Sequence, residues 1–481
     1  MLTKESPARQ VVGADIVRAV LVVGGAALIG ALVGLVGLSP QVWAGGIGLI
    51  LAIGVALLRY RVAFEGFCFI FFALFDFIGY VPLLSASIKI YLADGIILLM
   101  AVLCLRALSN RESMRSLASP VTGLLVINFF FGFFALLVGF GSGHQFNDVV
   151  GDFRRFFFYP LATLAALGYI LRRTDIRKLI LLFSVVLLVI SGIALVRVAK
   201  GQTWDPAQFA EKGDFRAIGY FTGVIVVMGL GVFYGFSLVS RGYRKWASVL
   251  ASGLLIGVGF LSGYRLLWAL LVMTPLFVSW TAYRGQRRNL RLILALLITA
   301  ALLIGALVVA QYLFADRFLL MKTKFQERVL GFSFQDNIRY VAWKAAWNRF
   351  ASSPIIGAGI GDQFSFWGIN SAGNPHLFRL TTHNVFLAIL YQTGVLGGGI
   401  FLVIHLRIVW YVWTRLPQIE PCIRAPLTGM LSGYLAALAL GMFQPLFESP
   451  GAIVGFYLWL GMMLNVLRLY LGDTVGTPEL L

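Results

Sequence analysis

Residues 381–397 read TTHNVFLAILYQTGVLG, which predicts an apolar helix of membrane length with an imidazole at its mouth. Thr381 and Thr382 stand just before this helix as candidate N-cap residues, and Gly394 and Gly397 lie further along it. The chain has only four histidines, so groups that exchange protons near neutral pH are scarce. His383 is therefore the first candidate for a chemical role. Other candidate residues are judged by whether they can lie close to it.

The composition is that of an integral membrane protein. Of the 481 residues, 59% are hydrophobic and 12% are charged, whereas a soluble domain has about half apolar and a quarter charged residues. Apolar runs of membrane length recur along the chain, which predicts helices rather than a barrel. We predict an all-α polytopic membrane protein of about 12–14 transmembrane helices. The first apolar run, 16–38, is too long for a signal peptide and is expected to be a start-anchor helix.

The hydrophobic pattern and the basic loops together predict the topology. Short loops rich in Lys and Arg alternate along the chain, and they place both termini in the cytoplasm. We divide the chain into N-terminal transmembrane helices (1–209), a second transmembrane region (210–470) and a short cytoplasmic tail (471–481). The spans are expected at 16–38, 42–58, 63–80, 91–107, 119–140, 155–171, 178–199, 219–240, 246–263, 265–283, 291–313, 383–406, 425–443 and 451–469.

The formal charge of +19 needs no nucleic-acid partner. Most of it is the excess of basic residues that cytoplasmic loops of polytopic proteins carry. The three cysteines, Cys68, Cys104 and Cys422, are too few and too scattered for a disulfide framework or a metal site. We expect neither a metal nor another cofactor.

The segment 314–382 is the longest outer connection, and loops of that length are usually functional. Within residues 336–350, one stripe at helical spacing is aromatic: Tyr340, Trp343, Trp347 and Phe350. This pattern fits an amphipathic helix in the membrane interface, and equally a helix packed over the tops of the spans. Further on, residues 357–361 read GAGIG, which indicates a glycine-rich turn and lacks the spacing of a nucleotide-binding loop.

Several basic residues fall on the outer side, where the positive-inside rule disfavours them. Arg265 lies between two apolar runs, and Arg216 lies where a loop enters the next span. Arginine forks bind phosphate bidentately and stay charged, so these residues are candidates for holding a lipid diphosphate. Arg154 and Arg155 are further candidates. The alternative is that these arginines reach lipid phosphates or pair with an acidic side chain, namely Asp76, Asp94, Asp148, Asp152 or Glu448.

Four segments together resemble the O-antigen ligase and O-antigen polymerase superfamily. The first runs from Arg339 through Trp343 and Trp347 to PIIGAG at 354–359; the second is THNVFL at 382–387, followed by GVLG at 394–397. The other two carry arginines, RAIG at 216–219 and SGYR at 262–265. The resemblance covers roughly residues 210–450.

This resemblance implies a polytopic glycosyltransferase of the bacterial inner membrane with its site facing the periplasm. Such enzymes take a glycan from undecaprenyl diphosphate and pass it to a hydroxyl, either of lipid A-core or of a second lipid-linked glycan. Arginines can stabilise the leaving diphosphate without a metal, and the acceptor hydroxyl needs a base. We assign His383 as the base and Arg265 and Arg216 to the diphosphate. Substrate-binding roles fall to Arg154, Arg155, Arg339, Asn384 and Glu448, with Glu448 as the reserve base.

Parts of the sequence are also compatible with other functions. Ligase and polymerase run the same chemistry on the same donor, and the long outer loop favours the ligase. His383 could instead be a structural residue that caps its helix. A transporter or flippase of lipid-linked glycan is a more remote alternative. The two halves of the chain show no repeat, and the candidate basic residues fall on one side of the membrane rather than at its midplane. An inactive partner in an envelope-assembly complex is the remaining possibility.

Overall fold

The computed structural model describes two short strands before residue 92 and most of the chain from residue 120 onward, chiefly 120–169, 173–199, 219–260, 265–282, 334–369, 375–380, 382–443 and 450–472. Helices dominate these ranges, and five of them are long and apolar enough to cross a membrane. The predicted all-α polytopic membrane class is therefore confirmed. The helices are α6 (Pro120–Gly141), α7 (Phe146–Phe153), α8 (Ala162–Tyr169), α9 (Arg173–Ala199), α11 (Tyr220–Val239), α12 (Gly242–Phe260), α13 (Arg265–Ala282), α16 (Phe334–Ser352), α17 (Val385–Arg415), α18 (Pro421–Phe443) and α19 (Pro450–Gly472).

Most predicted spans in the described part of the chain coincide with a helix. The expected spans 119–140, 219–240, 265–283 and 451–469 correspond to α6, α11, α13 and α19 within a few residues. The spans expected at 16–38, 42–58, 63–80, 91–107 and 291–313 lie outside the described residues, apart from Tyr91 at the end of β2 (Ile90–Tyr91) and the single helical residue Ile298. The total of about 12–14 spans therefore stays a prediction.

The span expected at 155–171 is wrong as a single helix. This segment consists of a π-helix at Arg154–Phe158, a 3-10 turn at Tyr159–Leu161 and then α8. Pro160 has no backbone N–H to donate, so the regular hydrogen-bond ladder cannot continue through it. The side chain of Asn128 compensates, because its Nδ2 donates to the Phe156 carbonyl over 2.9 Å.

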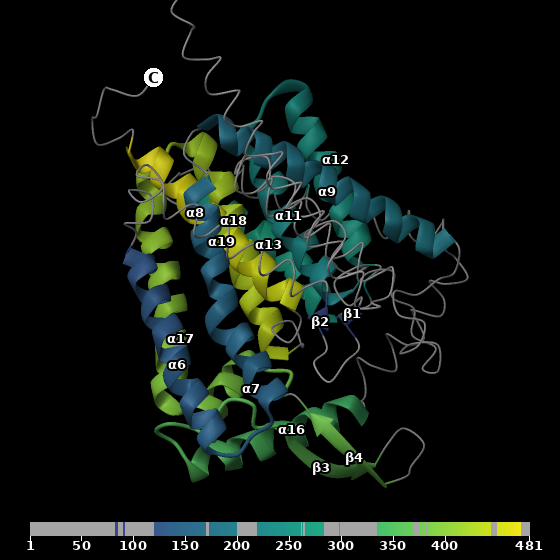
Figure 1. Ribbon diagram of the computed structural model, residues 1–481. Coiled ribbons are helices and arrows are strands. Elements are labelled where there is room, and N and C mark those ends of the chain that lie inside the picture. Colours follow the sequence, from purple (N-terminus) through teal and green to yellow (C-terminus); the bar gives the residue numbers. More distant parts are fainter. Residues whose placement is uncertain are drawn as a thin grey trace, which may run out of the picture.

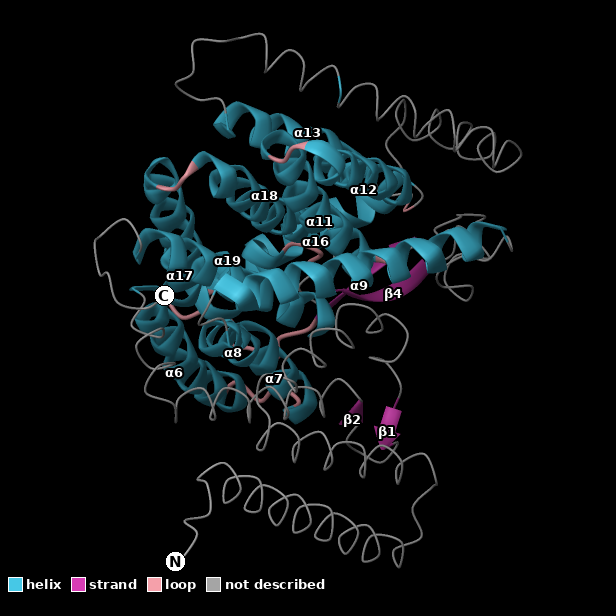
Figure 2. Ribbon diagram, turned by 90° about the horizontal axis from the view of Figure 1, so that it is seen from above, coloured by secondary structure: helices cyan, strands magenta, loops and turns pink. Residues whose placement is uncertain are grey.

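The centre of the bundle is a close antiparallel pair, α11 and α18. Gly231 faces the backbone of Gly429, and Gly235 faces the carbonyl of Ala425. Small residues at a helix contact let two backbones approach closely. This is common in membranes, where the hydrophobic effect does not drive helices together. α12 and α13 pack against α11, and α9 runs obliquely across the upright helices (Figures 1 and 2).

One end of the bundle carries an additional layer made from the long loop. α16 lies across this end beside a hairpin of β3 (Phe364–Ile369) and β4 (Pro375–Leu380), as Figure 1 shows. The hairpin is antiparallel and pairs Phe364 with Leu380 and Ile369 with Pro375. The sequence predicted the helix in segment 314–382 but not the hairpin. A second small hairpin joins β1 (Pro82–Leu84) to β2.

Helix α17 is broken at Gly394, and the preceding loop repairs the break. The amides of Val395 and Leu396 donate to the carbonyls of Pro354 and Ile355 over 2.8 and 3.3 Å. In the other direction, the carbonyls of Tyr391 and Gln392 accept from the amides of Ala358 and Gly359 over 2.8 and 3.0 Å. In an unbroken helix, residues 391 and 392 would have bonded directly to 395 and 396. Segment 354–359 therefore replaces two backbone bonds of the helix with four bonds of its own.

Glycines make this repair possible. Gly394 has φ 64°, which is left-handed, and a Cβ there would meet the carbonyl of Ile355. Gly357 has φ 77°, and a Cβ there would meet the backbone of Gln392 and Gly394. Residues with side chains rarely adopt these dihedrals, so both positions require glycine for conformation and for space.

We expect Gly394→Ala to lower the free energy of unfolding by about 2 kcal/mol or more, because a left-handed alanine and a clash with the loop act together. Gly399→Ala in the same helix is the matched control, since nothing lies within 4 Å of its Cβ position. That control should be neutral or stabilising by up to about 1 kcal/mol. Thermal unfolding of the detergent-purified protein measures both variants. Equal midpoints for the two would contradict the importance of the break.

Candidate functional site

The start of α13 and the start of α11 lie at the same end of the bundle as α16. Leu267, near the start of α13, contacts the Cβ position of Gly223 near the start of α11. Because α11 and α18 are antiparallel, the start of α11 lies beside the end of α18. There the ring of Phe443 contacts that of Trp343 in α16, with centroids 6.0 Å apart. Arg265, the first residue of α13, therefore belongs to the end of the bundle that α16 covers.

His383 lies at a built corner between α16 and α17. The indole of Trp343 donates to the Thr382 carbonyl over 2.8 Å. The Thr382 hydroxyl then donates to the Asn384 carbonyl over 2.8 Å. Both residues next to His383 are thus fixed by hydrogen bonds, so its backbone position is determined from both sides.

The N-cap of α17 is Asn384, not one of the two threonines that the sequence suggested. Its Oδ1 accepts from the Leu387 amide over 3.1 Å, which is the usual N-cap bond. Thr382 instead bonds the backbone of the cap residue, and Thr381 lies outside the described residues. His383 precedes the cap, so its side chain does not cap the helix.

His383 has a left-handed backbone with φ 49°, and it is the one non-glycine residue with positive φ in the described part of the chain. Such a conformation costs on the order of 1–3 kcal/mol for a residue with a side chain, although His tolerates it better than most. Strain of this kind concentrates at functional sites. The imidazole is half-buried at the end of the bundle that also holds Arg265.

The π-helix holds the two arginines that sequence analysis placed on the outer side. Arg155 donates from Nη1 to Oδ1 of Asp152 over 3.1 Å, so it realises the pairing that was the alternative to a substrate role. Arg154 is half-buried beside it. Single-turn π segments are rare and are often found at functional sites.

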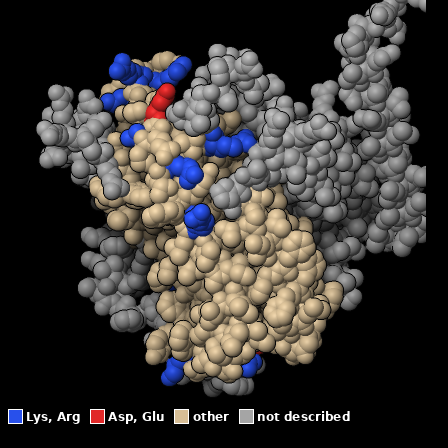
Figure 3. Space-filling view, turned by 90° about the vertical axis from the view of Figure 1, so that its left-hand side faces the viewer, with Lys and Arg blue, Asp and Glu red and all other residues tan. Residues whose placement is uncertain are grey.

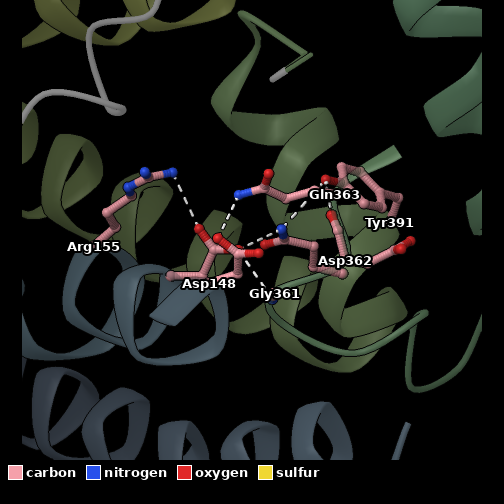
Figure 4. A network of polar contacts seen from close by, with 8 residues as sticks. Asp148, Arg155, Gly361, Asp362, Gln363 and Tyr391 are labelled. Atoms are coloured by element: carbon pink, nitrogen blue, oxygen red, sulfur yellow. Dashed lines mark hydrogen bonds and ion pairs between the residues drawn. The ribbon is translucent and has the colours of Figure 1, made fainter. Parts of the chain in front are cut away.

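Asp152 is the centre of a buried polar network (Figure 4). Besides Arg155, its carboxylate accepts from Nε2 of Gln392 over 2.7 Å and from the Gly361 amide over 3.0 Å. Burial raises the pKa of Asp152, and the Arg155 charge and these two hydrogen bonds oppose the rise. The network connects α7, the glycine-rich loop at residues 357–361 (the glycine loop) and the first half of α17 to one carboxylate.

Four further contacts fix the same loop from its edges. Arg349 of α16 forms a two-pronged ion pair with Asp362, with Nε 3.0 Å from Oδ2 and Nη2 3.3 Å from Oδ1. The Tyr391 hydroxyl donates to the Asp362 carbonyl over 2.9 Å, and Gln363 donates to Asp148 over 2.8 Å. On the other side, Nε2 of His144 donates to the Ala358 carbonyl over 2.9 Å.

The structure thus brings together part of the predicted site. Arg339 lies one turn before Trp343 on α16, half-buried, and so it joins the layer that holds the His383 corner. Asn384 is adjacent to His383 but uses its side-chain oxygen as the cap. Only the backbone position of Arg265 is described, and Arg216 and Glu448 lie outside the described residues.

Sequence analysis named Asp152 only as a possible partner of the outer arginines, and it missed Gln392 and Asp362. The spacing of glycines at 357, 359 and 361 did predict a turn, but no pattern links position 152 to position 392 along the chain. Among the described residues, no group of three or more His, Cys, Asp and Glu gathers as a metal site would require.

Comparison with known proteins confirms the predicted resemblance to the O-antigen ligase superfamily. Residues 250–402 match the family model described as O-antigen ligase. This range contains Arg265, Arg339, the glycine loop, His383 and the break at Gly394, and Asp152 bonds into it from outside. No curated protein matches the chain.

We expect Asp152→Ala to lower the free energy of unfolding by about 2–3 kcal/mol, because Gln392 and the Gly361 amide lose a buried acceptor. Asp148→Ala is the matched control on the same helix, since it removes one bond to the exposed side chain of Gln363 and should cost less than about 1 kcal/mol. Thermal unfolding in detergent tests the pair. If the unfolding midpoint of Asp152→Ala is at or above that of Asp148→Ala, the carboxylate does not hold the loop.

Proposed function

We propose that this protein is a metal-independent glycosyltransferase at the periplasmic face of the bacterial inner membrane. It moves an oligo- or polysaccharide from undecaprenyl diphosphate to an acceptor hydroxyl, and the acceptor we assign is lipid A-core. The matched family consists of glycosyltransferase-type enzymes that use lipid-linked glycans, which supports the class of reaction. The five candidate spans in the described residues are consistent with a lipid-borne substrate.

The observation that carries the proposal is the strained backbone of His383. A residue that only caps a helix does not need a positive φ. A residue that only packs could be replaced by a residue type that adopts this backbone without strain. Here the imidazole is held one residue before the cap, by neighbours that Trp343 and Thr382 fix in place. A side chain that must take a proton at a set position requires this kind of rigid support.

The chemistry follows from these positions. The acceptor hydroxyl gives its proton to the His383 imidazole while its oxygen forms a bond to the anomeric carbon of the glycan. The bond from that carbon to the diphosphate breaks, and its electron pair leaves on the phosphate oxygen. Arg265 and Arg216 stabilise the growing negative charge as preorganised donors. Arg154, Arg155, Arg339 and Asn384 contribute to substrate binding, and Glu448 is the reserve base.

His383→Asn should abolish most transfer while the protein still folds and binds the donor. Asparagine tolerates a left-handed backbone, so this substitution removes the imidazole without adding strain. A lost general base typically lowers the rate about 10²–10⁴-fold. The measurement is glycan transfer by purified enzyme with a defined lipid-diphosphate donor, run in parallel with lipid A-core and with a second lipid-linked glycan as acceptor.

Full transfer by His383→Asn would mean that His383 shapes the corner and that the base lies elsewhere. Transfer by the wild-type enzyme to the lipid-linked glycan alone would replace the ligase assignment by a polymerase. Donor bound and moved across vesicles without any transfer would support a flippase instead.

Arg265→Ala should reduce transfer about 10²–10³-fold, as the loss of one preorganised donor to a developing charge does. Arg265→Lys should rescue poorly, because a lysine lacks the two-pronged fork. Arg244→Ala is the matched control, since Arg244 is exposed near the start of α12, at the opposite end of the bundle. Equal activity in Arg265→Ala and Arg244→Ala would remove Arg265 from the mechanism.

A further inference from the structure

The break in α17 sets the depth of the molecule in the bilayer. α17 has 31 residues, so it would measure about 46 Å if it were straight, whereas the hydrocarbon core is about 30 Å thick. The part from Val395 to Arg415 alone reaches about 31 Å. This part therefore fills the core, and the boundary with the lipid headgroups lies near Gly394.

A second helix gives the same boundary. α6 has 22 residues, or about 33 Å, and it ends at Gly141. Close to that end, Gly139 contacts the Ile360 carbonyl of the same loop that repairs α17. In Figure 3, Lys and Arg side chains lie over the upper half of the face and again at its lower edge, and the wide stretch between them shows no charged side chain, as expected for a belt in lipid. The glycine loop thus lies at the level of the boundary.

The loop at this level exposes large apolar side chains. Ile355 is 66% exposed and Ile356 42% exposed, and the loop backbone bonds to Leu396, which is itself 48% exposed on α17. The exposed apolar surface of α17 therefore lies next to the exposed apolar side chains of the loop. Contact between this apolar surface and water is unfavourable, whereas its contact with lipid at the bilayer boundary is not.

The C-terminal half of α16 leads directly into this loop, and one flank of it has the chemistry of a membrane interface. Tyr340 and Trp347 are 66% and 55% exposed, and their spacing of seven residues places them on one face. Lys344 is exposed next to them. Trp and Tyr concentrate at bilayer interfaces, and a nearby cation attracts lipid phosphates.

We infer that the flank Tyr340–Lys344–Trp347, together with Ile355 and Ile356, is a membrane-docking surface that lies in the phospholipid headgroup layer. The helix is then interfacial along its outer flank and packed on α17 along its inner one, where Ala342 and Ala346 are buried against Tyr391. Because Trp343 of the same helix bonds Thr382, docking holds the His383 corner at the depth of lipid headgroups. This inference does not depend on the proposed function.

Spin labels at single cysteines test the docking surface. The three natural cysteines are replaced by serine, and Trp347→Cys, Tyr340→Cys and Ile355→Cys are each labelled in vesicles of phosphatidylethanolamine and phosphatidylglycerol. Ser352→Cys is the control, because Ser352 is exposed at the end of α16 and lies about 120° around the helix from Tyr340, off the flank that carries Tyr340, Lys344 and Trp347. Collisions with oxygen report lipid, and collisions with a water-soluble nickel chelate report water.

We expect the ratio of oxygen to nickel collisions to be several-fold higher at positions 340, 347 and 355 than at 352. A ratio at 340 and 347 equal to that at 352 would overturn the inference. Shielding of 347 only when free glycan is added would make the flank a glycan surface, and spin–spin broadening between labels would make it a contact between two copies. Both results would also overturn it. If the labelled variant at 340 or at 347 does not fold, the collision ratio at the other of these two positions decides the test.

Discussion

The arrangement of α16, the glycine loop and α17 depends on the four backbone hydrogen bonds that segment 354–359 makes to the broken helix α17. The backbone around the break is buried in protein, and a buried amide or carbonyl without a partner costs several kcal/mol. A helix can therefore break there only if other protein groups take the place of the lost partners. Two loop carbonyls and two loop amides do so here, and the left-handed glycines are what allow the loop to come close enough.

The break divides one long helix into two parts. The part after Gly394 is long enough to cross the membrane, and the part before it carries the N-cap and His383. The direction of that first part is fixed at its C-terminal end by Asp152 through Gln392 and by Asp362 through Tyr391. At its N-terminal end Trp343 fixes it through Thr382. Discontinuous helices occur at the binding sites of membrane transporters for a related reason, since a broken helix offers its terminus within the protein.

The sequence predicted the parts of the fold that depend on hydrophobicity and could not predict those that depend on tertiary hydrogen bonds. Runs such as 219–240 and 451–469 matched α11 and α19, because length and apolarity alone decide a span. The break at Gly394 was not predicted, since a glycine inside an apolar run usually marks close packing. The predicted cap, Thr381 or Thr382, was two or three residues too early, because threonine and asparagine are both good caps and the sequence does not show the left-handed backbone of His383 that precedes the true cap, Asn384. Asp152 and Gln392 lie 240 residues apart, and no local pattern indicates their contact.

The pairing of Arg155 with Asp152 changes how the outer arginines should be weighed. A cation at an external span end was unexpected under the positive-inside rule, and either a substrate or an internal acid could account for it. For Arg155 an internal acid is present at 3.1 Å, so its charge is offset before any substrate arrives. An arginine whose charge is offset contributes less to the field that a leaving diphosphate experiences, although its free N–H groups can still donate. In the proposed mechanism the electrostatic stabilisation therefore falls mainly to Arg265 and Arg216, whereas Arg155 pairs with the carboxylate that holds the glycine loop.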